Sequence, residues 1–218
     1  MTHIEGALRR SRGRPPVRSD EETRHVIADA ARREFLANGY VGACVDDIAK
    51  SAGVSKKTLY RLVPTKAELF RVSVTDRISS FMLAIDDKSI GSHDVEIALE
   101  RVVTEFGNLT LSAETIAIQK LAIAETDRFP ELGASFYADA IQVTQAALAK
   151  FLTKQCERGA LELEDPYAAA GMLRGMMIME PQRSVMFGRG ALLTPAEIAQ
   201  RARTCVRLFL RGCLADPV

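Results

Sequence analysis

The side chains best suited to chemistry in this 218-residue chain are hydrogen-bond donors on one short segment. They are Ser55, Lys56, Lys57, Thr58 and Tyr60. Hydroxyl and ammonium donors match the phosphate oxygens of a nucleic acid, and a lysine also matches the O6 and N7 acceptors of guanine. Two adjacent lysines alone usually indicate only a solvated surface, so the meaning of the segment depends on the elements that present it.

Two short predicted helices, joined by a tight turn, surround this segment. The first spans about residues 46–52 and the second about residues 56–63, with Gly53 in the turn and Ser55 as the N-cap of the second helix. This is the pattern of a helix-turn-helix, in which the second helix presents its outer face to the major groove of DNA. We therefore expect the donors of the segment to face DNA.

Charge is distributed unevenly along the chain. Residues 1–70 hold 13 Lys and Arg against 9 Asp and Glu, whereas residues 71–218 hold 16 against 19. Within residues 1–18, five arginines oppose a single glutamate, and Gly13, Pro15 and Pro16 disfavour a helix, so we predict a flexible basic arm. Arg12 and Arg14 in this arm are suited to an A·T-rich minor groove, although a solubilising tail that only attracts phosphate is the alternative.

The sequence argues against a membrane protein, a secreted protein and an enzyme. It has no stretch of about 18 uncharged apolar residues, and its arginine-rich start is not followed by the apolar part of a signal peptide, so we expect a cytoplasmic chain with no membrane partner. Nucleotide-binding and metalloprotease fingerprints are absent. The four cysteines have no zinc-ligand spacing, and we expect no catalytic residues, no cofactor and no metal.

One motif leaves an enzymatic alternative open. Glu22 to His25 is a Glu-x-x-His sequence, which a di-iron carboxylate bundle needs twice. Neither His3 nor His93 completes a second copy, so we interpret His25 as an exposed residue in the first turn of a helix.

A group of motifs in the first third of the chain belongs together. They are Ile27-Ala28-Asp29-Ala30-Ala31, Glu34-Phe35, Gly39-Tyr40, Val45-Asp46-Asp47-Ile48-Ala49, Ala52-Gly53-Val54-Ser55, Thr58-Leu59-Tyr60, Lys66 and Leu69-Phe70. Over about residues 22–72 they closely resemble the N-terminal domain of TetR-family transcriptional regulators. Further segments resemble the C-terminal domain of the AefR-like subgroup, namely Glu125 to Pro130, Arg158-Gly159 to Pro166 and Phe209 to Gly212.

The resemblance implies roles for single residues. It places Ser55 to Tyr60 in the recognition helix and implies that Tyr60 and Lys66 donate to DNA phosphates. Cys44 stands where the family usually has a Ser or Thr that caps the second helix and contacts phosphate, and a cysteine is a poor cap, at a cost of about 1 kcal/mol. Leu62-Val63 replaces the usual His-Phe pair. These departures support the alternative of a ligand-binding or adaptor protein without sequence-specific DNA binding.

We expect an all-α fold with a three-helix helix-turn-helix domain followed by a helical bundle for ligand binding and dimerisation. The predicted domains are a flexible basic arm over 1–18, a DNA-binding domain over 19–66 and a regulatory and dimerisation domain over 67–218.

Caps and apolar periodicity predict where the helices begin and end. A capping box of Ser19 and Glu22 begins the first helix, and Asn38-Gly39 ends it. Thr65 and Glu68 are expected to form a second capping box. Later helices are expected at 65–86, 93–110, 113–127, 130–158, 165–180 and 194–213, with caps at Asp94, Ser112 and Thr194.

The bundle offers candidates for an effector cavity and for a dimer interface. The cavity candidates are bulky apolar residues and polar residues within apolar helices, namely Phe81, Phe106, Gln119, Glu125, Tyr137, Gln142, Met172, Arg174 and Met176. The interface candidates are small or apolar residues at helical spacing in the last two helices, namely Ala168, Gly171, Gly175, Ala199, Ala202, Val206 and Leu210. Packing of these stripes within one subunit is the alternative.

The sequence therefore predicts a homodimeric regulator that binds a palindromic operator in double-stranded DNA. A small apolar or amphipathic effector, bound between the C-terminal helices, is expected to release it.

Overall fold

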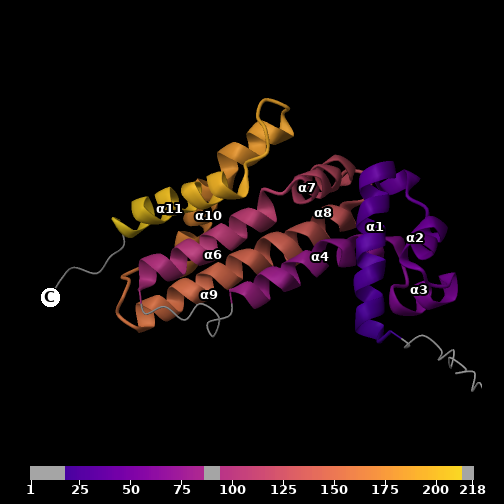
Figure 1. Ribbon diagram of the computed structural model, residues 1–218, viewed down its shortest axis with the longest axis horizontal. Helices are drawn as coiled ribbons and strands as arrows, with labels where there is room; N and C mark the ends of the chain where they lie inside the picture. Colours follow the sequence, from indigo (N-terminus) through magenta and orange to yellow (C-terminus); the bar gives the residue numbers. More distant parts are fainter. Residues whose placement is uncertain (1–17, 86–93, 213–218) are drawn as a thin grey trace, which may run out of the picture.

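The computed structural model describes residues 18–85 and 94–212, and every regular element within these ranges is helical. In chain order the elements are α1 (Asp20–Gly42), α2 (Val45–Ala52), α3 (Lys56–Leu62), α4 (Lys66–Ala84), α6 (Val95–Thr110), α7 (Ala113–Glu125), α8 (Pro130–Phe136), the π-helix η1 (Tyr137–Gln142), α9 (Val143–Glu157), α10 (Pro166–Met186) and α11 (Pro195–Leu210). Figure 1 shows α1 to α3 gathered at one end of a long helical bundle. None of the described helices is long and apolar enough to span a bilayer.

Side-chain caps begin several helices, as predicted. The Ser19 hydroxyl accepts the Glu22 N–H at 3.1 Å, and the Glu22 carboxylate accepts the Ser19 N–H at 2.7 Å. The predicted caps of α6, α7 and α11 are also present, at Asp94, Ser112 and Thr194. These local signals fix where the helices begin because each satisfies N–H groups that have no partner within the helix.

A predicted capping box and the predicted end of the first helix differ from the structure. Thr65 caps α4, but the Glu68 carboxylate binds Arg71 at 2.6 and 2.8 Å and makes no return bond to Thr65. The first helix does not end at Gly39 but bends there, with φ 70° and ψ 177°, and continues to Gly42. Only glycine adopts such a φ freely.

One apolar core holds the first three helices together and continues into the bundle. Ile48 and Leu59 are fully buried in it, and Ile118 of α7 and Phe136 of α8 belong to the same core. Because α4 and this core both extend past residue 66, the helix-turn-helix is packed firmly against the remainder of the chain. The predicted domain boundary at 66/67 stays a prediction.

A second core joins the C-terminal helices. Fully buried Leu99, Leu152, Leu173 and Val206 bring α6, α9, α10 and α11 together in it. In Figure 1, α10 and α11 run along one side of the bundle that α6 and α9 form.

Helix α10 continues six residues beyond the predicted end at residue 180, although Pro181 lies inside it. Proline has no N–H, so the carbonyl of Met177 lacks its helical partner. Arg201 of α11 supplies a replacement, because its Nε donates to the Met177 carbonyl at 2.7 Å and its Nη2 to the Met176 carbonyl at 2.8 Å. The α11 side chain therefore lets α10 continue through the proline.

We expect Arg201→Leu to lower the free energy of unfolding by about 1–3 kcal/mol, because the Met177 carbonyl loses a charged donor that its own helix cannot replace. Arg203→Leu is the control, since Arg203 binds Gln200 of its own helix, at 2.6 and 3.2 Å. Urea denaturation followed by circular dichroism measures both variants. Equal losses in the two variants would contradict this interpretation of Arg201.

Candidate nucleic-acid interface and effector cavity

The turn between α2 and α3 has the geometry that the sequence predicts. Gly53 adopts the left-handed conformation at φ 67° and ψ 35°, which reverses the chain after α2. The Ser55 hydroxyl then accepts the Thr58 N–H at 3.0 Å and begins α3. Leu59, which is fully buried, fixes the inner face of α3, so the opposite face is turned to solvent.

The predicted recognition residues lie together on this outer face. Ser55, Lys56, Lys57 and Tyr60 are exposed, with Tyr60 at 41%, and Thr58 is half-buried. Within the described ranges, Lys57 and Tyr60 have no hydrogen-bond partner. Their donors are therefore available to phosphate oxygens or to the acceptors of bases.

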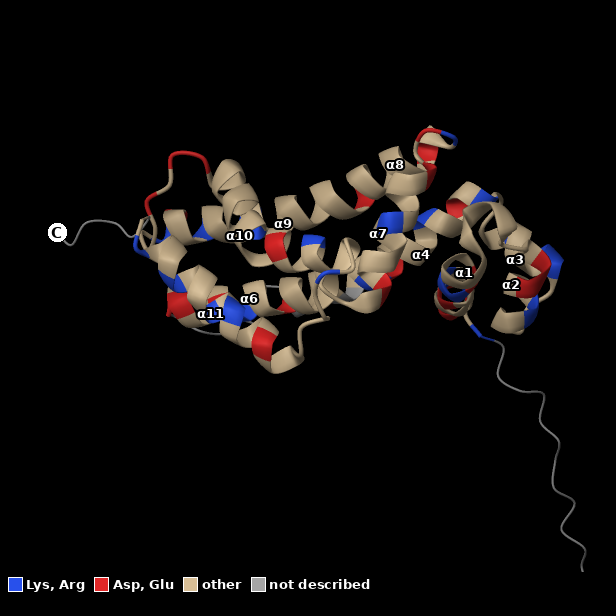
Figure 2. Cartoon of the chain, turned by 90° about the horizontal axis from the view of Figure 1, so that it is seen from above, with Lys and Arg blue, Asp and Glu red and all other residues tan. Residues whose placement is uncertain are grey.

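Acidic side chains partly neutralise the positive charge of this surface (Figure 2). The Lys56 ammonium lies 2.7 Å from the Asp46 carboxylate, and this hydrogen bond raises the pKa of Lys56. Arg61, at the end of α3, forms a two-bond pair with Asp20 of α1 at 2.7 and 2.8 Å. Sequence analysis missed both acidic partners. Asp20 lies 41 residues from Arg61, and no local pattern links the two.

The four other residues predicted to contact DNA differ in their surroundings. Cys44 is exposed at the start of α2 and makes no side-chain cap, as its type predicts. The Lys66 ammonium donates to the carbonyls of Val41 and Ala43, at 3.0 and 2.6 Å, so two of its three donors are already used within the protein. Arg12 and Arg14 lie outside the described residues.

Both Glu22 and His25 of the Glu-x-x-His motif make contacts within the protein. Glu22 caps α1, and His25 contacts the carboxylate of Asp76 on α4. Among the described residues, no three His, Cys, Asp or Glu side chains gather as metal ligands do.

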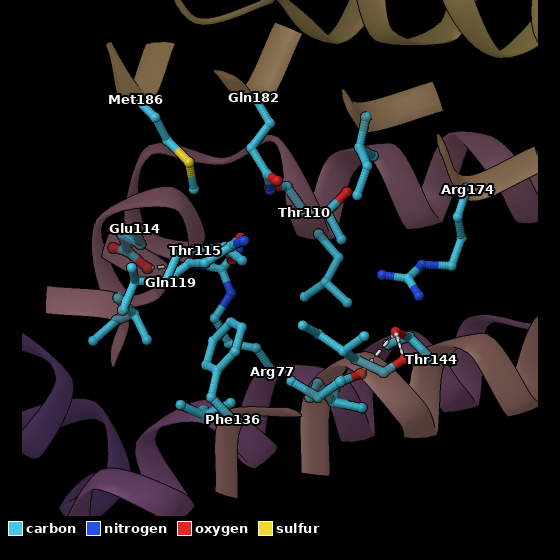
Figure 3. Close-up of a pocket in the computed structure, with 18 of the residues that line it drawn as sticks. Arg77, Thr110, Glu114, Thr115, Gln119, Phe136, Thr144, Arg174, Gln182 and Met186 are labelled. Carbon is cyan, nitrogen blue, oxygen red and sulfur yellow. Dashed lines mark hydrogen bonds and ion pairs between the residues drawn. The ribbon is translucent and has the colours of Figure 1, made fainter. Parts of the chain in front are cut away.

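A cavity of about 360 Å³ lies between the helices of the bundle (Figure 3). Helices α4, α6, α7 and α10 provide most of its walls, and Phe136, Ala140, Ile141 and Thr144 close it from the α8–η1–α9 side. Its walls are mainly apolar. Figure 3 shows polar side chains at opposite ends, with Glu114 at one end and Arg174 at the other. This volume is within the range of about 300–1,000 Å³ that is typical of small-molecule sites, and such sites are also lined mainly by apolar side chains.

Two of the nine predicted effector residues, Gln119 and Arg174, line this cavity. Phe106 is buried beneath Arg174, with its ring centre 5.6 Å from the guanidinium carbon. The other predicted residues lie outside the cavity walls and are Phe81, Glu125, Tyr137, Gln142, Met172 and Met176. Met172, for example, is 69% exposed because it lies two positions from Arg174 and therefore points to the other side of α10.

The predicted dimer residues divide into two groups. Ala202, Val206 and Leu210 are buried within their own subunit, in the core shared with α6, so this part of the predicted interface is not available to a partner. The other group is accessible, since Ala168 is exposed and Gly171, Gly175 and Ala199 are half-buried.

A charged cluster connects α1 with the cavity. Glu114, in the first turn of α7, binds Arg77 of α4 and lies 3.2 Å from Nε of Arg32 on α1. The Arg32 side chain is only 12% exposed and also binds Asp29. All three members of the Glu114 cluster (Arg32, Arg77 and Glu114) line the cavity. Sequence analysis missed this cluster because its members are far apart in the chain.

Comparisons with known proteins agree with this geometry. Residues 27–72 match the model of bacterial regulatory proteins of the tetR family, and residues 97–212 match that of the AefR-like transcriptional repressor C-terminal domain. A candidate TetR-family regulator from Mesorhizobium loti MAFF303099 has a similar structure, with a TM-score of 0.77 and 27% identity over 91% of this chain and 100% of its own. The flavonoid-responsive regulator FrrA gives a TM-score of 0.69 at 27% identity, over 90% of this chain and 100% of its own.

A curated relative is similar over the DNA-binding part alone. The candidate mycofactocin biosynthesis regulator MftR of Mycobacterium tuberculosis (strain ATCC 25618 / H37Rv) is 43% identical over 44 residues, which are 20% of this chain and 22% of that protein. The chain thus matches less than a quarter of the length of that relative. The two family models together cover most of the described chain. The model of the C-terminal domain alone covers more than half of the 218-residue chain. The chain therefore belongs to the TetR family of DNA-binding transcriptional regulators, with an AefR-like C-terminal domain.

Proposed function

We propose that this protein is a ligand-responsive repressor that binds a palindromic operator as a homodimer. The observation that carries the proposal is the free outer face of α3, where Lys57 and Tyr60 are exposed without partners in the described chain, at one end of a bundle that encloses a cavity. A symmetric dimer presents two such faces, and their spacing must match successive major grooves, about 34–36 Å apart.

A stripe on α10 supports dimerisation. Ala168, Met172, Gly175 and Met179 follow one another at spacings of four, three and four residues, so they share one face of the helix. Met172 is 69% and Met179 45% exposed, so the stripe presents neighbouring apolar side chains to solvent, and contiguous apolar patches mark protein–protein contacts. We assign this α10 stripe to the contact between the two subunits.

The Glu114 cluster supports regulation from the cavity. It joins α1, which supports α2 and α3, to α4 and α7 at the cavity wall. A ligand at this end of the cavity changes the surroundings of Arg32 and Arg77, and hence the orientation of α1. Release of DNA requires that the ligand favour one orientation, with a coupling free energy of about 1–3 kcal/mol in typical cases.

Fluorescence anisotropy with the DNA upstream of its own gene tests the proposed DNA binding. Contacts to about 6–10 phosphates predict a loss of about 10³–10⁵ in affinity between 50 and 200 mM salt. Affinity that does not change with salt, or no binding at all, would favour a helical ligand-binding or adaptor protein. Among the comparisons, FrrA is described as flavonoid-responsive, so a flavonoid is a first effector to test.

We expect Glu114→Gln to weaken DNA binding by about fivefold, although Glu114 is not on the DNA-facing surface. Without the carboxylate, α1 is held less firmly, and each helix-turn-helix samples more orientations that do not fit the groove. Glu96→Gln is the matched control, because Glu96 is also an acidic residue in the first turn of a helix but lies on α6, away from the cavity. Equal DNA affinity of wild type and Glu114→Gln would contradict the proposed role of the cluster.

A further inference from the structure

Arg174 is a cavity arginine for which the described residues supply no acidic partner. Its Nη1 donates to the side-chain oxygen of Gln145 at 2.9 Å, whereas its Nε is buried with no hydrogen-bond partner among the described residues. Burial lowers the pKa of Arg174, yet a guanidinium stays protonated in a protein. The cavity wall therefore holds a half-buried positive charge that the described part of the chain does not neutralise.

The other arginines of the cavity wall have different surroundings. Arg32 and Arg77 both pair with Glu114, and Arg32 also pairs with Asp29. Arg183 is exposed, so water screens its charge. Of the described residues, Glu114 is the only acidic one that lines the cavity, against four arginines. The wall is thus electropositive, and its uncompensated charge inside the cavity lies at Arg174.

The structure holds this guanidinium in place. Gln145, which accepts from Nη1, in turn donates to the carbonyl of Tyr167 at 3.3 Å. The guanidinium also lies over the ring of Phe106. Figure 3 shows it directed from α10 into the space above Thr144. An unpaired charge at a fixed position inside a protein is costly, and a ligand of opposite charge removes that cost.

The space beyond Arg174 is apolar. Its walls include Ile78, Leu109, Ile118, Phe136, Ile141 and Ile178. Such walls favour a hydrocarbon or aromatic body, and they offer it few hydrogen-bonding groups.

We propose that the effector is an amphipathic carboxylate, whose carboxylate pairs with Arg174 and whose apolar body lies along the cavity toward Glu114. That the bound carboxylate regulates DNA binding rests on the function proposed above, whereas the binding of a carboxylate at Arg174 does not. A carboxylate accepts two parallel hydrogen bonds from a guanidinium, and this pairing explains why an arginine is used at this end of the cavity.

Isothermal titration calorimetry with decanoate and decanamide tests the proposal, because the two probes share the same chain and differ in charge. We expect the wild-type protein to bind decanoate at least tenfold more tightly than decanamide. Arg174→Gln should reduce decanoate affinity at least tenfold and leave decanamide affinity unchanged. Arg174→Lys keeps the charge without the paired donors and should give an intermediate affinity for decanoate.

Arg207→Gln is the control, since Arg207 is an exposed arginine on α11 that does not line the cavity. It should bind decanoate as the wild type does. Equal affinities for the two probes, or equal losses in Arg174→Gln and Arg207→Gln, would overturn the proposal. So would a neutral flavanone that binds wild type and Arg174→Gln equally while decanoate does not bind.

DNA binding measured on the same preparations separates the two proposals. If the protein binds DNA but does not prefer decanoate to decanamide, the carboxylate proposal fails and the repressor proposal stands. If decanoate binding depends on Arg174 but no DNA is bound, the repressor proposal fails and the carboxylate proposal stands.

Discussion

The double variant Lys57→Ala, Tyr60→Phe is expected to bind operator DNA at least about 100-fold more weakly than the wild type, since each lost base or phosphate donor costs about 1–3 kcal/mol. A dimer loses each donor twice. Both side chains are exposed on α3, so the fold should be unaffected. Fluorescence anisotropy with an operator selected from random-sequence DNA measures the effect, and circular dichroism confirms that the helices remain.

Two further variants make this expectation specific to α3. Lys150→Ala removes an equal charge from an exposed position on α9 and should have little effect on affinity. Asp46→Asn should strengthen binding, because it frees the Lys56 ammonium from its partner and removes a negative charge near the DNA. If Lys150→Ala weakened binding as much as the double variant, DNA would be bound by the charge of the whole protein rather than by α3.

The exposed outer face of α3 was predictable because its signals are local. The left-handed glycine at residue 53 and the Ser55 cap lie within a few residues of the helices that they shape. The same holds for the caps of α6, α7 and α11. Once these signals had given the helix boundaries, the apolar periodicity was enough to predict that Lys57 and Tyr60 lie on the solvent-exposed face of α3.

Contacts between distant helices were not predictable in this way. Arg201 of α11 donates to the Met177 carbonyl and lets α10 continue past Pro181. No sequence pattern near residue 181 indicates this contact. Periodicity also identified the apolar stripe of α11 without showing what covers it. Ala202 and Val206 pack within their own subunit, which was the stated alternative to an interface. For the cavity, the rotation of α10 decides that Arg174 faces inward while Met172 faces outward.

Gly175→Arg is expected to convert the protein from a dimer to a monomer and thereby to abolish tight operator binding. Gly175 lies in the α10 stripe, and a Cβ added there meets no atom of the described subunit within 4 Å. Gly107 is the opposite case, because a Cβ there would lie 2.4 Å from the Cε of Met177. The Gly175 substitution therefore spares the subunit's own packing, and replacing a glycine within a helix even favours the helix by up to about 1 kcal/mol.

The bulk and charge of the introduced guanidinium act only where a second subunit approaches. Two copies of the new side chain would face each other across a symmetric contact, since both subunits use the same surface. Sedimentation velocity measures the mass, with Ala134→Arg on the exposed side of α8 as the control that adds the same side chain elsewhere. A dimer that persists in Gly175→Arg would exclude the α10 stripe as the contact and move the interface to another face. A monomer that still binds the palindrome tightly would instead contradict the need for two coupled recognition helices.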